Sequence, residues 1–120
     1  MKLILTILIL LIALQHLAFL WLEMFAWTTT GKKVFRSLKP DLFEPTKVLA
    51  ANQGLYNGFL AAGLIWSVLI SDPVWSANVA LFFLSCVFIA GLYGGWSASR
   101  RIFWIQGLPA LITIGVLMMG

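Results

Sequence analysis

Residues 3–27 read LILTILILLIALQHLAFLWLEMFAW, an apolar run interrupted by only a few polar side chains. At about 1.5 Å of rise per residue, a helix of this length exceeds the roughly 30 Å of a bilayer's hydrocarbon core. Further apolar stretches follow at 48–70, 77–96 and 102–119. The pattern predicts an all-α protein, a four-transmembrane-helix membrane bundle made of two hairpins.

The composition of the whole chain leads to the same conclusion. Of its 120 residues, 62% are hydrophobic and only 10% are charged, and the mean hydropathy is +1.00. A soluble domain of this size has too little interior to bury so much apolar surface, whereas a lipid bilayer accepts it directly. We therefore expect residues 1–120 to form a single integral membrane domain with the lipid bilayer as its main partner.

Basic residues are concentrated in two of the breaks between the apolar stretches. These breaks hold Lys32, Lys33, Arg36, Lys39, Lys47, Arg100 and Arg101, and only Lys2 lies on the other side. Lys and Arg beside membrane segments are retained on the cytoplasmic side. We expect a basic cytoplasmic loop at 28–47 against anionic lipid headgroups, both termini extracytoplasmic, and a place in the cell membrane. Because the charges form short runs rather than one basic face, no nucleic-acid binding is expected.

A cleaved signal peptide is the alternative interpretation of the first stretch. Lys2 followed by a run to Leu14 that is apolar except for Thr6 resembles that design. No small-x-small cleavage site follows, however, and the apolar character continues to Trp27. This length favours a membrane helix.

Two prolines predict features of the later helices. Asp72 and Pro73 are typical of a helix start, in which the aspartate caps backbone N–H groups and the proline takes the first helical position. Pro109 cannot donate a hydrogen bond to the carbonyl of Ile105. We expect a bend one turn above Gln106 that widens the space beside it.

Polar side chains within the apolar stretches are few and fall at similar depths. A charge at the bilayer centre costs about 2.5–3.5 kcal/mol on insertion scales, so each such group requires an explanation. Counting inward from the basic ends predicts a cytoplasm-facing polar pocket centred on Glu23, with His16 and Asn57 in a deeper layer. The candidate members are His16, Glu23, Asn52, Gln53, Asn57, Tyr93 and Gln106.

Simpler interpretations of these residues stay open at this point. Asn, Gln and His in membrane helices often make interhelical hydrogen bonds of about 1 kcal/mol and nothing more. Glu23 can also extend toward the interface or pair with Lys47 across the hairpin.

Small residues occupy every fourth position along one face of the second stretch. Ala50, Gly54, Gly58 and Ala62 allow another helix to approach the backbone closely. This face predicts helix packing. It is also the basis of an alternative function, a structural or accessory subunit that docks another protein or forms a homo-oligomer.

Signatures of soluble enzymes are absent from the sequence. There is no phosphate-binding glycine loop, no HExxH motif and only one histidine, so no metal site or cofactor is expected. Cys86 is the single cysteine, which excludes a disulfide within the chain. The sequence therefore does not favour an enzyme. One alternative stays open, a membrane enzyme that acts on a lipid or quinone with Glu23 and His16 as proton carriers.

Two segments carry a family resemblance. The sequence LEMFAW at 22–27, followed by KVLAANQGLYNGFLAAG at 47–63, resembles the small bacterial and fungal membrane family catalogued as domain of unknown function 1304. The resemblance covers essentially the whole chain and implies a multi-pass membrane protein without an established activity. The residues that carry it include Glu23, Asn52, Gln53 and Asn57.

The function we expect is binding or transport of a small amphipathic or cationic molecule in the polar pocket. A carboxylate partly removed from water can exchange a proton for a cation, and Glu23 is the only acidic group available for that role within the apolar stretches.

Overall fold

The computed structural model describes residues 2–120, and within them the protein is helical. Its long helices are α1 (Leu3–Phe25), α3 (Lys47–Leu69), α4 (Pro73–Ser97) and α6 (Leu108–Met119). The connections contain α2 (Thr30–Val34), the 3₁₀ turn η1 (Pro40–Leu42), α5 (Arg100–Ile102) and the π-helical turn η2 (Phe103–Gly107). No strand occurs from residue 2 to residue 120, which confirms the predicted all-α class.

Three helices are long and apolar enough to cross a membrane. They are α1, α4 and the continuous stretch Arg100–Met119, which α5, η2 and α6 form together. These helices indicate a membrane protein, in agreement with the composition. With 23 residues α3 is as long as α1, but Lys47 and three amide side chains in its first half lower its hydropathy, and it is not among the three.

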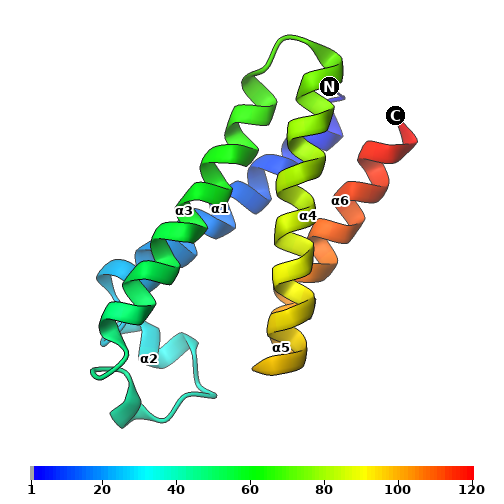
Figure 1. The fold of residues 1–120 in the computed structure, drawn as a ribbon. Coiled ribbons are helices and arrows are strands. Elements are labelled where there is room, and N and C mark those ends of the chain that lie inside the picture. The colour runs from blue at the N-terminus through cyan, green and yellow to red at the C-terminus, as the bar shows by residue number, and fades with distance from the viewer. Residues whose placement is uncertain (1) are drawn as a thin grey trace.

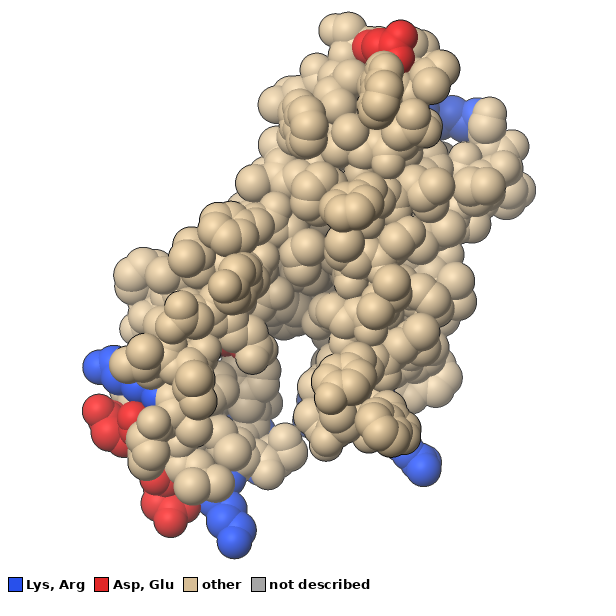
Figure 2. Space-filling model, in the orientation of Figure 1, with Lys and Arg blue, Asp and Glu red and all other residues tan. Residues whose placement is uncertain are grey.

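The long helices form two antiparallel pairs (Figure 1). α1 packs along α3, and α4 packs against α5, η2 and α6. The pairs meet at the end that holds the turn between α3 and α4, where both termini also lie (Figure 1). Figure 2 shows an open gap between the two pairs at the opposite end of the molecule. We call this opening the interhelical gap.

An apolar core joins the two pairs beyond the interhelical gap. All four long helices contribute to it, through Leu5, Ile9, Ile12, Ala13, Ala61, Leu64, Ala80, Leu84, Val87 and Ala110. Many other large apolar side chains are exposed, among them Phe82, Ile89 and Met118. An apolar outer surface of this kind suits lipid tails as the surrounding medium.

The helix boundaries differ in detail from the apolar stretches. Oδ2 of Asp72 accepts a hydrogen bond from the backbone N–H of Trp75 at 2.9 Å, and α4 begins at Pro73. The capped turn therefore places the start before Ala77, where the apolar stretch begins. α1 ends at Phe25, and the loop that follows contains α2 and η1.

The last membrane segment is irregular next to its proline. Because Pro109 has no N–H, the carbonyl of Ile105 loses its usual helical donor. The segment adopts the π-helical turn η2 here, in which the N–H of Leu108 donates to the carbonyl of Phe103. The structure thus has a π-helical turn where the sequence predicts a bend.

Candidate functional site

Glu23 carries a carboxylate that is buried between α1 and α3. It is 4% exposed. Its Oε2 accepts a hydrogen bond from Nε2 of Gln53, and its Oε1 accepts one from Nδ2 of Asn57, both at 2.6 Å. These distances are short for N–H···O hydrogen bonds. We call Glu23, Gln53 and Asn57 the carboxylate clamp.

Helix periodicity explains why two amides reach one carboxylate. Gln53 and Asn57 are four residues apart, so they lie one turn from each other on one face of α3. Between them, Gly54 allows α1 to come close: a Cβ at Gly54 would lie 3.0 Å from Cβ of Glu23 and 2.8 Å from Cγ of Met24. The glycine therefore sets the distance at which the amides meet the carboxylate.

The face of small residues on α3 packs mainly on α1 of the same chain. A Cβ at Gly58 would lie 2.6 Å from Cδ1 of Leu20. Ala50 is buried, whereas Ala62 is exposed. With Gly54 also against α1, this face serves the helix pair and offers little surface to a second molecule.

His16 lies seven residues from Glu23 on nearly the same face of α1 and is fully buried. Its Nδ1 is 2.8 Å from the carbonyl oxygen of Ile12, and its ring meets that of Phe19 edge-on with centroids 5.3 Å apart. Its Nε2 has no hydrogen-bond partner within the described part of the chain. Asn57, which the sequence places at the depth of His16, bonds to Glu23 instead.

Three of the predicted pocket residues lie elsewhere. Asn52 is exposed and donates a hydrogen bond to the carbonyl of Val48 in its own helix at 2.9 Å. Tyr93 is 65% exposed and lies beside the ring of Trp96. Gln106 is half-buried in η2 and belongs to the other helix pair. The hydrogen-bond partners of Glu23 are Gln53 and Asn57, and none of these three side chains is among them.

Gln15 was not among the predicted pocket residues, yet it links the two pairs. Its Nε2 donates to the carbonyl oxygen of Ile105 at 2.9 Å. This is the carbonyl that Pro109 leaves without its helical donor, so the amide of Gln15 supplies the missing hydrogen bond. Two features of the sequence could have indicated this contact: the proline in the last membrane segment and the amide of Gln15 in the first.

The same hydrogen bond explains why counting depth from the helix ends fails for Gln106. That count assumes parallel helices with their ends at one level, but α1 runs obliquely to α4 (Figure 1). The contact of Gln15 with Ile105 brings η2 level with Gln15. Gln106 therefore lies near a point eight residues, or about 12 Å, along α1 from Glu23.

The carboxylate clamp lies where α1 diverges from the second helix pair. Gln15, Phe19 and Glu23 are spaced by four residues and follow one face of α1. Gln15 contacts the second pair, and Glu23 lies about 12 Å farther along α1 toward the basic loop. At this point of α1 both carboxylate oxygens of Glu23 are directed to α3. Gln53 is exposed, so the clamp can be reached although its carboxylate is covered.

The clamp has unused acceptor capacity. An ionised carboxylate offers about four lone-pair positions, and the two amides occupy two of them. Both amides are neutral, so they solvate the negative charge without cancelling it. Within residues 2–120 no three His, Cys, Asp or Glu side chains are grouped as metal ligands. The arrangement is suited to a cationic hydrogen-bond donor.

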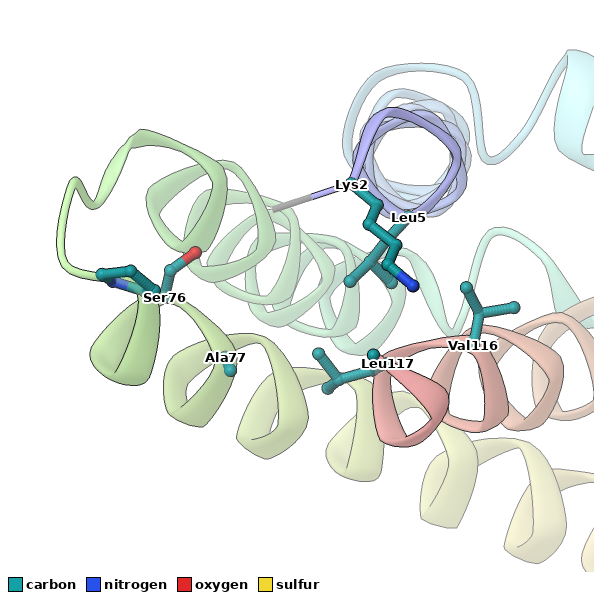
Figure 3. A pocket seen from close by; sticks show the side chains of 8 residues that line it. Lys2, Leu5, Ser76, Ala77, Val116 and Leu117 are labelled. Atoms are coloured by element: carbon teal, nitrogen blue, oxygen red, sulfur yellow. The ribbon is translucent and has the colours of Figure 1, made fainter.

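A separate cavity lies at the opposite end of the molecule, between the ends of α1, α4 and α6 (Figure 3). Its volume is about 390 Å³, and it is lined by Lys2, Leu5, Pro73, Ser76, Ala77, Val116, Leu117 and Gly120. In Figure 3 the side chain of Lys2 points toward α6. None of the predicted pocket residues lines this cavity, and no acidic side chain does.

Comparison with known proteins covers nearly the whole chain. The family model described as "Protein of unknown function (DUF1304)" matches residues 10–118. The uncharacterized protein YpaA of Lactococcus lactis subsp. lactis (strain IL1403) is 31% identical over 110 residues, which cover 90% of this chain and 91% of that protein. No solved structure matches the chain. The matched region includes every residue of the carboxylate clamp.

Proposed function

The chain belongs to the DUF1304 family of proteins of unknown function, and we propose that it binds a small amphipathic or cationic molecule at the carboxylate clamp. The observation that carries this proposal is the buried carboxylate of Glu23, which is 4% exposed and held by two neutral amides. A carboxylate in a membrane interior is costly unless a compensating charge is present. A cation brought in by a ligand supplies that charge.

The shape of the molecule supports entry of the ligand from one end of the interhelical gap. The interhelical gap is open at the end near the basic loop (Figure 2), and the apolar core fills the space beyond Gln15. A continuous pore would need polar groups along its whole length. The gap is therefore an opening at the basic end of the molecule rather than part of a continuous pore.

The proposal includes a topology. We place α3 in the membrane as a fourth span, with the basic end in the cytoplasm, both termini outside and the loop 28–47 against anionic headgroups of the cell membrane. Two observations support it. α3 packs along α1, where two of its polar side chains meet Glu23. Most of the Lys and Arg side chains in view lie at one end of the molecule (Figure 2).

Assembly through the small-residue face has less support. Gly54 and Gly58 already face side chains of α1 in the same chain. An enzyme that uses both His16 and Glu23 on a lipid also has less support, because His16 is fully buried. We therefore keep ligand binding as the proposed function.

The test is calorimetric titration of octylammonium into the full-length protein in nanodiscs, with neutral octanol as the matched ligand. The wild-type protein should bind octylammonium more tightly than octanol by about tenfold, the ratio that one charge-assisted hydrogen bond supports. In Glu23→Gln this preference should disappear, because the carboxylate has become a neutral amide. Glu23→Asp keeps the charge and should retain a preference.

Asn52→Leu is the matched control, since Asn52 is an amide on the same helix that does not contact Glu23. Its preference for octylammonium should equal that of the wild type. Equal binding of octylammonium by wild-type protein and folded Glu23→Gln would refute the proposed function.

A further inference from the structure

We infer that the cavity between the ends of α1, α4 and α6 binds a fatty acid, whose carboxylate pairs with Lys2 and whose single chain fills the apolar space. This cavity lies at the opposite end of the molecule from the carboxylate clamp and shares no residue with it. The inference therefore goes beyond the proposed function and does not depend on it. The volume of about 390 Å³ falls within the range of roughly 300–1,000 Å³ that is usual for small-molecule pockets.

The residues that line the cavity stand at two levels, because α1 and α4 begin here and α6 ends here. The level at the mouth is exposed and consists of Lys2, Pro73 and Gly120. About one helical turn deeper lie the buried or half-buried Leu5, Ala77, Val116 and Leu117. All four deeper side chains are apolar, and Leu5 belongs to the core that joins the helix pairs. The cavity thus has a charge at its mouth and an apolar base.

Lys2 alone has a charged side chain among the described residues that line the cavity. The side chain points toward α6 (Figure 3), and its Nζ lies 3.5 Å from the position that a Cβ would take at Gly120. Ser76 is the other polar side chain of the lining, and its hydroxyl already donates a hydrogen bond to the carbonyl of Ser67 at 2.6 Å. The ammonium of Lys2 is therefore the side-chain group that is left to donate to a ligand.

The direction of the Lys2 side chain selects the charge of the ligand. A lysine at the end of a membrane helix usually extends outward into the headgroup layer. Here the side chain extends across the mouth instead, so its N–H donors stand at the opening of the apolar space (Figure 3). No acidic side chain from residues 2–120 lines the cavity to balance the charge. An anionic group attached to an apolar chain matches both levels.

A fatty acid fits this cavity better than a phospholipid. Its one carboxylate balances the one ammonium, and its one chain suits a volume near the lower end of the usual range. A phospholipid carries a second acyl chain, whereas the base of the cavity is bounded by the core and by side chains packed against it. Helices that can cross a membrane end here, so the carboxylate would lie at the level of the lipid headgroups and the chain would point into the bilayer.

The experiment is native mass spectrometry of the full-length protein in non-ionic detergent micelles with equal amounts of dodecanoate and dodecanol. Wild-type protein should retain dodecanoate about fivefold more than dodecanol, the upper end for an ion pair that solvent can reach. Lys2→Gln should bring this ratio to about one, because the ligand's negative charge loses its partner. Lys2→Arg keeps the positive charge and should keep a preference. Lys32→Gln, at an exposed lysine of the basic loop, is the control and should keep the wild-type ratio.

A second variant tests the apolar part of the site. Ala77→Phe places a large ring in the deeper level, so it should lower the retention of dodecanoate and dodecanol alike. Ala62→Phe is the matched control, since Ala62 is an exposed alanine on α3 that does not line the cavity. It should retain both molecules as the wild type does. Equal losses in the two variants would place the chain outside the cavity and overturn the inference.

Phosphatidylglycerol with two dodecanoyl chains distinguishes the two lipid sources of a negative charge. Wild-type protein should retain it less than dodecanoate. Stronger retention of phosphatidylglycerol that depends on Lys2 would overturn the assignment to a fatty acid. Equal retention of dodecanoate and dodecanol by the wild type would overturn the inference as a whole, and so would a preference that survives Lys2→Gln.

Discussion

The two helix pairs both bring their backbones close together at glycines, but they differ in what the glycines meet. In the second pair, a Cβ at Gly91 would fall on the backbone Cα and N of Gly107. In the first pair, a Cβ at Gly54 or Gly58 would meet side-chain atoms of Met24 or Leu20. At Gly91 the atoms nearest to the added Cβ are backbone atoms, whereas at Gly54 and Gly58 they are side-chain atoms at 2.8 and 2.6 Å, and the backbone oxygen of Leu20 lies at 3.2 Å from a Cβ at Gly54.

The polar groups follow the same division. The first pair holds the buried carboxylate and its two amide donors, whereas the contact of Gly91 with Gly107 is lined by backbone and the Phe103 ring. Side chains can change rotamer at small cost, but a backbone contact cannot adjust without moving a helix. The comparison indicates a rigid contact at Gly91 in the second pair and a more adaptable contact in the first pair, which holds the proposed ligand site.

The largest expected effect is on the rigid contact. Gly91→Ala should destabilise the protein by about 3 kcal/mol, the upper end of the range for overpacking, because the added methyl group meets backbone atoms. Unfolding by sodium dodecyl sulfate in mixed micelles, followed by tryptophan fluorescence, measures this change. Gly115→Ala is the control in the same pair, since nothing lies within 4 Å of a Cβ there. If Gly91→Ala lowers the free energy of unfolding no more than Gly115→Ala does, the distinction between the two contacts is refuted.

The second effect concerns the carboxylate clamp. Asn57→Leu should cost about 2 kcal/mol, because it removes a hydrogen bond to a charged acceptor and leaves that oxygen of Glu23 unsatisfied. Asn52→Leu, the same substitution on the outer face of α3, should change the free energy of unfolding by at most about 0.5 kcal/mol. The same detergent titration compares the two variants. Equal costs would show that the amide of Asn57 does not stabilise the buried carboxylate.

The smallest effect concerns the bond between the pairs. Gln15→Leu should cost about 0.6 kcal/mol, the average for one interhelical hydrogen bond in a membrane protein. In Pro109→Ala the restored N–H competes for the carbonyl of Ile105, so the further cost of Gln15→Leu should fall toward zero. A double-mutant cycle on these two positions measures the coupling. Strictly additive costs would mean that Gln15 does not replace the donor lost at Pro109.

Much of the fold was accessible from local sequence. Long apolar runs predicted the helices, and Asp72 with Pro73 predicted the start of α4. The face with Gly54 and Gly58 predicted helix packing, and α1 is the helix that packs there. These features depend on length, hydrophobicity and spacing along one helix, all of which a single segment contains.

The candidate site was accessible only in part. Glu23, Gln53 and Asn57 were in the predicted set and meet in the structure. Asn52 is adjacent to Gln53 but points away, because neighbouring residues on a helix are about 100° apart. Helical periodicity shows that Asn52 and Gln53 face different sides of α3. Which of the two meets Glu23 depends on the side of α3 where α1 packs, and the sequence alone does not give that side.

By itself the sequence determined that the chain is helical, that most of its surface is apolar, and which few polar side chains stand inside. The tertiary structure alone decided which of those side chains meet. Contacts between helices depend on their inclination and rotation, and these result from packing over many side chains rather than from any one segment. That is why Gln15 bonds to Ile105 while Glu23 bonds to two amides of α3.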